Sequence, residues 1–206
     1  MGSLLLSGLL LVASAFCVSA QTLVQNDETT GPTAKPTPAA AGYVRPDSKT
    51  RQKRYVNSMF GPMALGKNVV SAGWATWRNS PEEWGPHWEG FGRRFASSLG
   101  KGIIKNTVSY ALDESFKLDS HYYRSKDKSV GAKVENALIS PVTARDKNGK
   151  RVFGFPRVLG TYTASVIAAE TWYPARYTYK DGLKNGTISL GMNAAFNLVK
   201  EFIWKK

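Results

Sequence analysis

The chain contains almost no cysteine and little histidine, and these absences exclude several kinds of site. Its one cysteine, Cys17, lies in an apolar N-terminal segment, so cleavage after Ala20 leaves a chain with none. A chain without cysteine has no disulfide, no cysteine-ligated zinc and no thiol nucleophile. The only histidines are His87 and His121. Such a protein depends on a hydrophobic core, for which 42% hydrophobic residues supply the material.

Motifs of known catalytic and metal sites are also missing. No Gly-x-Ser-x-Gly segment is present, so the many serines give no sign of a nucleophile elbow. A metal site from His87, His121, Glu114 and Glu170 is conceivable, but the repeated Glu-x-x-His spacing of carboxylate-bridged helix bundles is absent. We therefore predict no metal and no cofactor. The sequence favours a non-enzymatic role without deciding it.

Residues 1–20 are typical of a secretory signal peptide. Residues 4–18 are apolar or small throughout, and residues 18–20 provide small side chains at a cleavage site. The apolar run is too short to span a bilayer comfortably. We predict cleavage after Ala20 and export to the periplasm or to a membrane surface of the envelope. A lipid on Cys17 and an uncleaved anchor are the alternatives.

Residues 21–56 have the composition of a linker. Prolines are interleaved with Thr, Ala and Gly, and large apolar residues are nearly absent. Such a segment buries too little surface to offset the entropy of ordering it, so we predict disorder. Its basic end suits either a solvated tether or a patch that rests on anionic lipid or another polyanion. The basic residues are Arg45, Lys49, Arg51, Lys53 and Arg54.

Residues 57–206 are predicted to form a single, mainly α-helical domain. Hydrophobic periodicity and helix start and stop signals predict about five helices, near residues 59–77, 87–118, 129–140, 156–172 and 187–204. Asp146-Lys147-Asn148-Gly149 is a turn signal, so a short hairpin or extended loop is expected between the third and fourth helices.

The helix at 87–118 is the predicted centre of the domain, packed on the first and last helices. Ser80-Pro81-Glu82-Glu83 has the pattern of a capping box just before it. Gly92, Ala96 and Gly100 recur every fourth residue, and such a row of small residues lets another backbone approach closely.

The last helix has an alternative. Ile188, Met192, Val199 and Phe202 share one face of a helix, but residues 188–198 also alternate between apolar and polar positions, which is the period of a strand. Helix is favoured, because it leaves the polar residues near the end facing outward. If the strand period holds here and in 161–179, the fold is instead a β-barrel-like outer-membrane protein.

The chain is strongly basic. Its net charge is +13, and residues 57–206 hold 22 Lys and Arg against 12 Asp and Glu, which gives +10. For an exported protein, the expected partner is anionic lipid or an envelope polyanion, and we predict no nucleic acid. The charges are spread along the chain, which favours a solubilising surface over a specific binding face. None of the apolar segments is a clean transmembrane helix.

Polar residues near the end of the central helix are the candidates for catalysis. Glu114, His121 and Arg124 are close enough in sequence to form a network with Asp119. We expect this network to be structural, with the free carbonyls of the helix end favouring a protonated His121. The candidates for binding are Arg93, Arg94, Trp172 and Tyr173.

Four short motifs are spread over roughly residues 57–204. They are Glu82-Glu83-Trp84-Gly85, Phe91-Gly92-Arg93-Arg94-Phe95-Ala96, Glu114 followed by His121-Tyr122-Tyr123-Arg124-Ser125, and Thr171-Trp172-Tyr173-Pro174. Together they resemble a group of uncharacterised bacterial exported proteins. The resemblance implies a bacterial envelope setting and no activity.

Three hypotheses of function follow. The favoured one is a structural or membrane-surface protein of the envelope, held by amphipathic helices and basic charge. The second is a soluble periplasmic binding or interaction module whose aromatic residues line a ligand groove. The third is a hydrolase or metal enzyme that uses His121 with Glu114.

Overall fold

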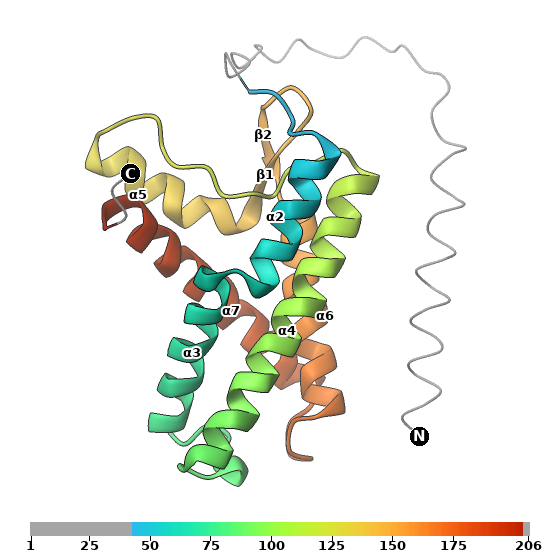
Figure 1. The fold of residues 1–206 in the computed structure, drawn as a ribbon, viewed down its shortest axis with the longest axis vertical. Coiled ribbons are helices and arrows are strands. Elements are labelled where there is room, and N and C mark those ends of the chain that lie inside the picture. Colours follow the sequence, from blue (N-terminus) through green and yellow to red (C-terminus); the bar gives the residue numbers. More distant parts are fainter. Residues whose placement is uncertain (1–42, 204–206) are drawn as a thin grey trace. The chain divides into compact units, whose positions relative to one another are not determined.

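The fold is mainly helical, as the sequence predicts. The computed structural model describes residues 43–203, which contain two short strands besides the helices (Figure 1). The predicted signal peptide 1–20 and residues 21–42 of the predicted linker lie outside the described residues. The elements are α2 (Ser48–Phe60), α3 (Pro62–Trp77), the 3₁₀ turn η1 (Glu82–Trp84), α4 (Trp88–Ser115), α5 (Val130–Ile139), the 3₁₀ turn η2 (Ser140–Val142), β1 (Thr143–Arg145), β2 (Arg151–Phe153), α6 (Phe155–Thr171) and α7 (Tyr179–Phe202).

Helix α2 occupies sequence that we had assigned mostly to the disordered linker. Arg45 and Arg51 form ion pairs with Glu114 of α4, and Arg54 lies 3.8 Å from Asp119. The basic end of the linker is thus bound to carboxylates of the domain. Composition predicted disorder because few apolar residues are present, whereas charge pairing orders this part of the chain. The predicted boundary at residue 56 is therefore wrong for residues 43–56.

One capping box differs from the prediction, and so does the start of the last helix. The expected capping box at Ser80 and Glu83 is not formed, since only the turn η1 follows and α4 begins later, at Trp88. A capping box does form at Thr178 and Asp181, where each residue accepts a hydrogen bond from the backbone of the other. Helix α7 therefore starts directly after Thr178, eight residues before the predicted start at residue 187.

Other local predictions are confirmed. The ambiguous segment 187–199 is helical and lies within α7, so the strand alternative is wrong. Ser129 caps α5 by accepting a hydrogen bond of 3.3 Å from the N–H of Ala132. Strands β1 and β2 form an antiparallel hairpin on either side of the predicted turn.

Helix α4 is the centre of the fold. It packs against α3, as expected, but its other main neighbour is α6 rather than α7. Helix α6 packs in turn on α7, which also contacts α5 (Figure 1). At Gly160 of α6 a Cβ atom would lie 2.6 Å from the carbonyl oxygen of Lys105, so only glycine fits at this close approach of α6 to α4.

The side chains buried between the helices are small or polar. Within residues 43–203, the buried apolar side chains are six alanines, three prolines and Met59. Small side chains let helices approach closely, and buried polar groups form hydrogen bonds across the contacts. The buried polar residues include Arg94, Ser97, Asp119, Asn136, Thr161, Ser165, Asn197 and Glu201.

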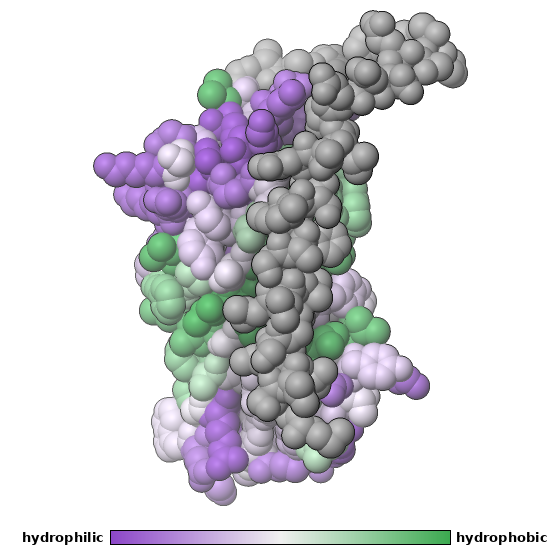
Figure 2. All heavy atoms as spheres, turned by 90° about the vertical axis from the view of Figure 1, so that its right-hand side faces the viewer, coloured by the Kyte–Doolittle hydropathy of each residue, from purple (hydrophilic) through white to green (hydrophobic). Residues whose placement is uncertain are grey.

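Large apolar side chains lie mainly on the outside. Val70 is 61% exposed, Trp74 56% and Ile188 54%. On the side drawn in Figure 2, hydrophobic residues gather across the middle of the described chain, with hydrophilic residues toward its two ends. The apolar stripe predicted on the last helix is present but is exposed, and the large apolar side chains of α3 are exposed as well. Among the described helices, none combines the length and the apolar character needed to cross a membrane.

Candidate functional site

The chain that leaves α4 runs as an extended segment, 119–125, beside β1. Two backbone hydrogen bonds of 2.8 and 2.9 Å pair Asp119 with Arg145. The carboxylate of Asp119 accepts hydrogen bonds from the hydroxyls of Tyr123 (2.7 Å) and Tyr43 (2.8 Å) and from the N–H of His121 (2.8 Å). Burial opposes ionisation, but these hydrogen bonds hold the pKa of Asp119 below its usual value.

Glu201, near the end of α7, is the acceptor of a second polar cluster. It accepts hydrogen bonds from the hydroxyl of Tyr122 (2.6 Å), the N–H of Ser125 (2.9 Å) and the side-chain amide of Asn136 (2.9 Å). Burial opposes its ionisation, but these bonds and the charge of Arg124 hold its pKa below the usual value. Segment 119–125 is therefore fixed to α7 and α5 as well as to β1.

Glu114 belongs to neither cluster. The hydrogen bond from Arg51, and then the charge of Arg45, lower its pKa against the opposing effect of burial. Within the described residues no hydrogen bond or ion pair joins Glu114 to His121. The two residues that we named for hydrolase or metal chemistry are not paired here.

His121 lies beyond α4, which ends at Ser115 rather than at residue 118. Its ring packs edge-on against Tyr123, with 5.4 Å between the ring centroids. Desolvation of the ring and the positive charge of Arg54 lower the pKa of His121, so the ring is neutral at pH 7. A protonated imidazole at the helix end is therefore not what the structure supports, because α4 ends at Ser115 and the lowered pKa leaves the ring neutral.

Replacement of His121 by alanine should change stability little. Its imidazole makes no hydrogen bond with any described residue, so the variant leaves no buried partner unpaired. We expect His121→Ala to cost less than about 1 kcal/mol in the free energy of unfolding. Urea unfolding of both proteins measures this difference. A loss of several kcal/mol would contradict the observed contacts, whereas an activity or bound metal lost at unchanged stability would support the enzyme hypothesis.

A metal centre has no support among the described residues. Within 43–203, no three or more His, Cys, Asp or Glu side chains come close enough together to hold a metal ion.

Arg94, one of the residues predicted to bind a ligand, is buried and holds a loop. It donates hydrogen bonds to the carbonyl oxygens of Ser80 (3.0 Å), Pro81 (2.5 Å) and Gly85 (2.6 Å). These bonds organise the turn before α4. A fourth hydrogen bond, of 3.3 Å, goes to the side-chain oxygen of Asn79, so the guanidinium group holds this turn and lines neither of the two pockets described below.

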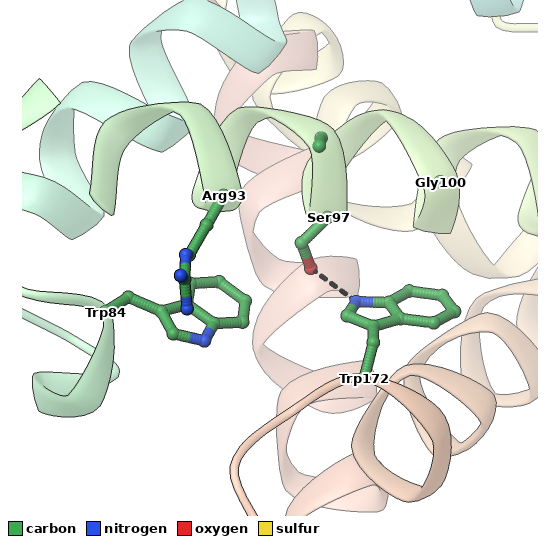
Figure 3. A pocket seen from close by; sticks show the side chains of 6 residues that line it. Trp84, Arg93, Ser97, Gly100 and Trp172 are labelled. Carbon is green, nitrogen blue, oxygen red and sulfur yellow. Dashed lines mark hydrogen bonds between the residues drawn. The ribbon is translucent and has the colours of Figure 1, made fainter. Parts of the chain in front are cut away.

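Two other predicted binding residues, Arg93 and Trp172, line a pocket of about 470 Å³ between η1, α4 and the end of α6 (Figure 3). Trp84 and Arg93 stand on one side of it and Trp172 on the other. The indole N–H of Trp172 donates a hydrogen bond of 2.9 Å to the hydroxyl of Ser97, which fixes the ring. Tyr173 lies next to the pocket, edge-on to Trp84 with 5.2 Å between the centroids.

The floor of this pocket is formed by Ala96, Ser97 and Gly100 of α4, two of which belong to the predicted row of small residues. We had expected Gly92, Ala96 and Gly100 to admit another backbone. Instead, the ring of Trp172 lies 3.8 Å from where a Cβ of Gly100 would be, and Gly92 has open space beside it. The arrangement offers two indole rings to an apolar or aromatic group and one guanidinium to an acidic group, although Arg93 also contacts Glu89 at 2.6 Å.

Sequence reasoning did not single out Trp84 or Ser97 as site residues. Trp84 lies in one of the motifs that carry the resemblance, but nothing in its spacing connects it with Trp172. Comparisons of the chain with protein-family models, with curated proteins and with solved structures find no match. The functional argument therefore depends on the chain's own residues.

Proposed function

We propose that this protein binds the surface of a membrane containing anionic lipids, as a structural component of a bacterial envelope. The observation that carries the proposal is the outward orientation of the large apolar side chains on α3 and α7. The exposed apolar face of α3 consists of Met63, Val69, Val70, Trp74 and Trp77, and that of α7 consists of Ile188, Met192, Val199 and Phe202.

Two such faces are unfavourable in water. Complete transfer of one exposed large apolar side chain out of water is favourable by about 1.5–3 kcal/mol of free energy. The inner side of α3 carries Ala72, which is buried, and Asn68, which accepts a hydrogen bond of 2.8 Å from Ser98 of α4, so small and polar residues face inward. Contact with lipid accounts for the outward apolar side chains and for the inward polar and small ones, because an interfacial helix buries its apolar face among the acyl chains.

Charge and tryptophan content favour lipid over a protein partner. Residues 57–206 have a net charge of +10, which attracts anionic headgroups. Trp74 and Trp77 are exposed at the end of α3, with 5.0 Å between their ring centroids. Tryptophan is enriched where a protein meets the membrane–water interface, since its ring is apolar and its N–H is polar. The envelope setting is proposed on the signal-like N-terminus and the motif resemblance.

Vesicle flotation tests the proposal. The full chain should float with vesicles of phosphatidylcholine and phosphatidylglycerol, and less with phosphatidylcholine alone. Raising the salt from 0.1 to 1 M shortens the Debye length from about 10 to about 3 Å and should weaken the binding. Some binding should remain, because the apolar contribution is not screened.

Self-association is the main competing explanation for the apolar faces. Size-exclusion chromatography with light scattering distinguishes it. A stable dimer that does not float with either vesicle would show that a second copy of the chain, rather than lipid, covers these faces.

A second candidate function is supported by the pocket between Trp84 and Trp172. A soluble module that binds a small aromatic or apolar acid would use the two indole rings and Arg93. Such a ligand should quench tryptophan fluorescence, and Ser97→Ala should weaken the effect because it releases the ring of Trp172. A protein that binds such a ligand and does not float with vesicles would favour this function over the first.

A further inference from the structure

The hairpin β1–β2 places two arginines side by side. Arg145 of β1 and Arg151 of β2 are direct cross-strand partners, so their side chains project from the same face of the hairpin. Cβ atoms at such positions lie about 4.5–5.5 Å apart, and like charges directly opposite each other are destabilising. Asp119 pairs with Arg145 on the other side of β1. The three residues therefore form one row across the strands, with two neighbouring cations at one end of it.

A small cavity lies beside this row, and both arginines line it. Its volume is about 20 Å³, which exceeds the roughly 10–15 Å³ that one water molecule requires. Arg151 is exposed, so a solute has access to the cavity from that side. We call this cavity the arginine pocket. Its lining residues are Asp119, His121, Tyr123, Ser140, Thr143, Ala144, Arg145 and Arg151.

Most of the arginine N–H groups at the pocket have no acceptor in the protein. A guanidinium group carries five N–H donors. Arg145 uses one of them on the carbonyl oxygen of Gly149, at 3.1 Å, and Arg151 uses one on the side-chain oxygen of Asn136. Within the part of the chain that the structure describes, these are the only hydrogen bonds of the two side chains, and the ring of His121 makes none. The pocket wall can therefore donate several hydrogen bonds to a ligand.

The acidic side chain that lines the pocket has other partners. Asp119 accepts hydrogen bonds from two tyrosine hydroxyls and one backbone N–H, and Arg54 lies 3.8 Å from it. Among the residues of the described chain, no ion pair joins Asp119 to Arg145 or Arg151. The pocket therefore has two arginine charges and one carboxylate that is already satisfied, which leaves an excess of positive charge.

The shape of the pocket favours a carboxylate among the anions. The rings of Tyr43 and Tyr123 hold Arg145, with their centroids 5.6 and 5.1 Å from its Cζ atom. The paired N–H groups of a guanidinium match the two oxygens of a carboxylate. A cavity of about 20 Å³ suits such a planar end group better than the four oxygens of a phosphate.

We propose that Arg145, Arg151 and His121 form a binding site for a carboxylate group. The two guanidinium groups bind its oxygens, and the ring of His121 donates a further N–H to it. The ligand is a free small carboxylic acid or the C-terminal carboxylate of a peptide, which present the same two oxygens. None of the three residues belongs to the apolar faces of α3 and α7, so binding does not require lipid.

Thermal unfolding of the full chain with sodium formate, the smallest carboxylate, tests the site. Sodium chloride at matched ionic strength serves as the salt control. At a formate concentration about tenfold above the dissociation constant, Tm should rise by about 3–6 °C beyond the chloride control. Isothermal titration calorimetry gives the dissociation constant and stoichiometry, and one formate for each chain is expected. A rise no larger in formate than in chloride would overturn the proposal.

Arg151→Gln should weaken formate binding at least tenfold, because it removes one of the two guanidinium groups. Lys147→Gln is the matched control, since Lys147 is exposed on the turn of the same hairpin and does not line the pocket. It loses the same charge and should leave the affinity unchanged. His121→Ala is a second pocket variant, expected to weaken binding several-fold at a nearly unchanged Tm in chloride. Equal formate affinities for Arg151→Gln and Lys147→Gln would overturn the proposal, since binding would then reflect overall charge. Unchanged affinity in His121→Ala would remove His121 from the site.

N-Acetylglycylglycine and its C-terminal amide separate the two sources of the carboxylate. If the peptide with the free carboxylate binds at least as tightly as formate, the ligand is a peptide C-terminus; if it binds more weakly, the ligand is a free small acid. The amide has the same shape without the charge and should not bind. Equal binding of the peptide and its amide would overturn the proposal, because the carboxylate would then contribute nothing.

Discussion

Asp119→Ala should lower the free energy of unfolding by about 3–5 kcal/mol, because it removes the acceptor of a buried polar cluster. Two tyrosine hydroxyls, from Tyr43 and Tyr123, would lose their hydrogen-bond acceptor, and so would the N–H of His121. Arg54 would also lose a carboxylate 3.8 Å away. For a domain of this size, we expect a fall in Tm of about 10 °C. Urea and thermal unfolding measure both quantities.

Asp127→Ala is the control for this variant. Asp127 accepts a hydrogen bond of 2.8 Å from the N–H two residues ahead, at Ser129, just as Asp119 does from His121, but it is exposed. We expect a change within about 0.5 kcal/mol. If the two variants were equally stable, the buried cluster would not hold segment 119–125 in place.

The cost of Asp119→Ala should also depend on pH. The folded-state pKa of Asp119 is below its unfolded value of 3.8. Its charge therefore stabilises the fold above pH 3.8, and this contribution is lost as the pH falls through the folded-state pKa. The difference between wild type and variant should be largest near neutral pH and shrink below pH 3.8. A difference that grew on acidification would contradict this sign.

Val70→Asp combined with Trp74→Asp should reduce vesicle binding at least tenfold. Both residues lie on the apolar face of α3, where they are 61% and 56% exposed. The variant loses apolar contact with the acyl chains and adds two charges that anionic headgroups repel. Because neither side chain is buried within the domain, Tm should change little. Vesicle co-sedimentation over a range of lipid concentrations gives the partition coefficients.

Val130→Asp combined with Phe153→Asp is the matched control. These residues are 66% and 64% exposed, on α5 and β2, and the double variant carries the same two added charges. It should retain most of the binding, with only the small loss that a lower net charge causes. Equal loss in both variants would show that overall charge, and not the face of α3, determines membrane binding.

The positions of most helices were predictable from local sequence. Ser129 before an apolar run predicted the start of α5, and Pro156 predicted that of α6, because capping and proline geometry depend on a few neighbouring residues. The same kind of signal failed at Ser80, where Pro86 and the positive φ of Gly85 end the turn after one 3₁₀ segment. At Thr178 a capping box forms, but no long apolar run follows it in the sequence, so the start of α7 was not predicted there.

The candidate sites were less predictable. Arg93 and Trp172 were chosen as surface arginine and terminal aromatic residues, and only the packing of α6 on α4 brings them to one pocket. Arg94 follows Arg93 in the sequence but holds the turn before α4 instead of lining the pocket, since successive residues on a helix face different directions. Glu114 and His121 were paired because they are close in sequence. In the structure, Glu114 forms ion pairs with Arg45 and Arg51, which lie outside the predicted domain.

The sequence by itself determined that the domain is helical, where most helices lie and which residues share a face. The tertiary structure decided which way each face points. Periodicity reports only that Val70 and Trp74, or Ile188 and Met192, lie on one side of a helix. Whether that side is buried depends on the surfaces that other helices present to it. Here the small and polar residues of α4 and α6 fill the interior, so the apolar stripes of α3 and α7 remain outside.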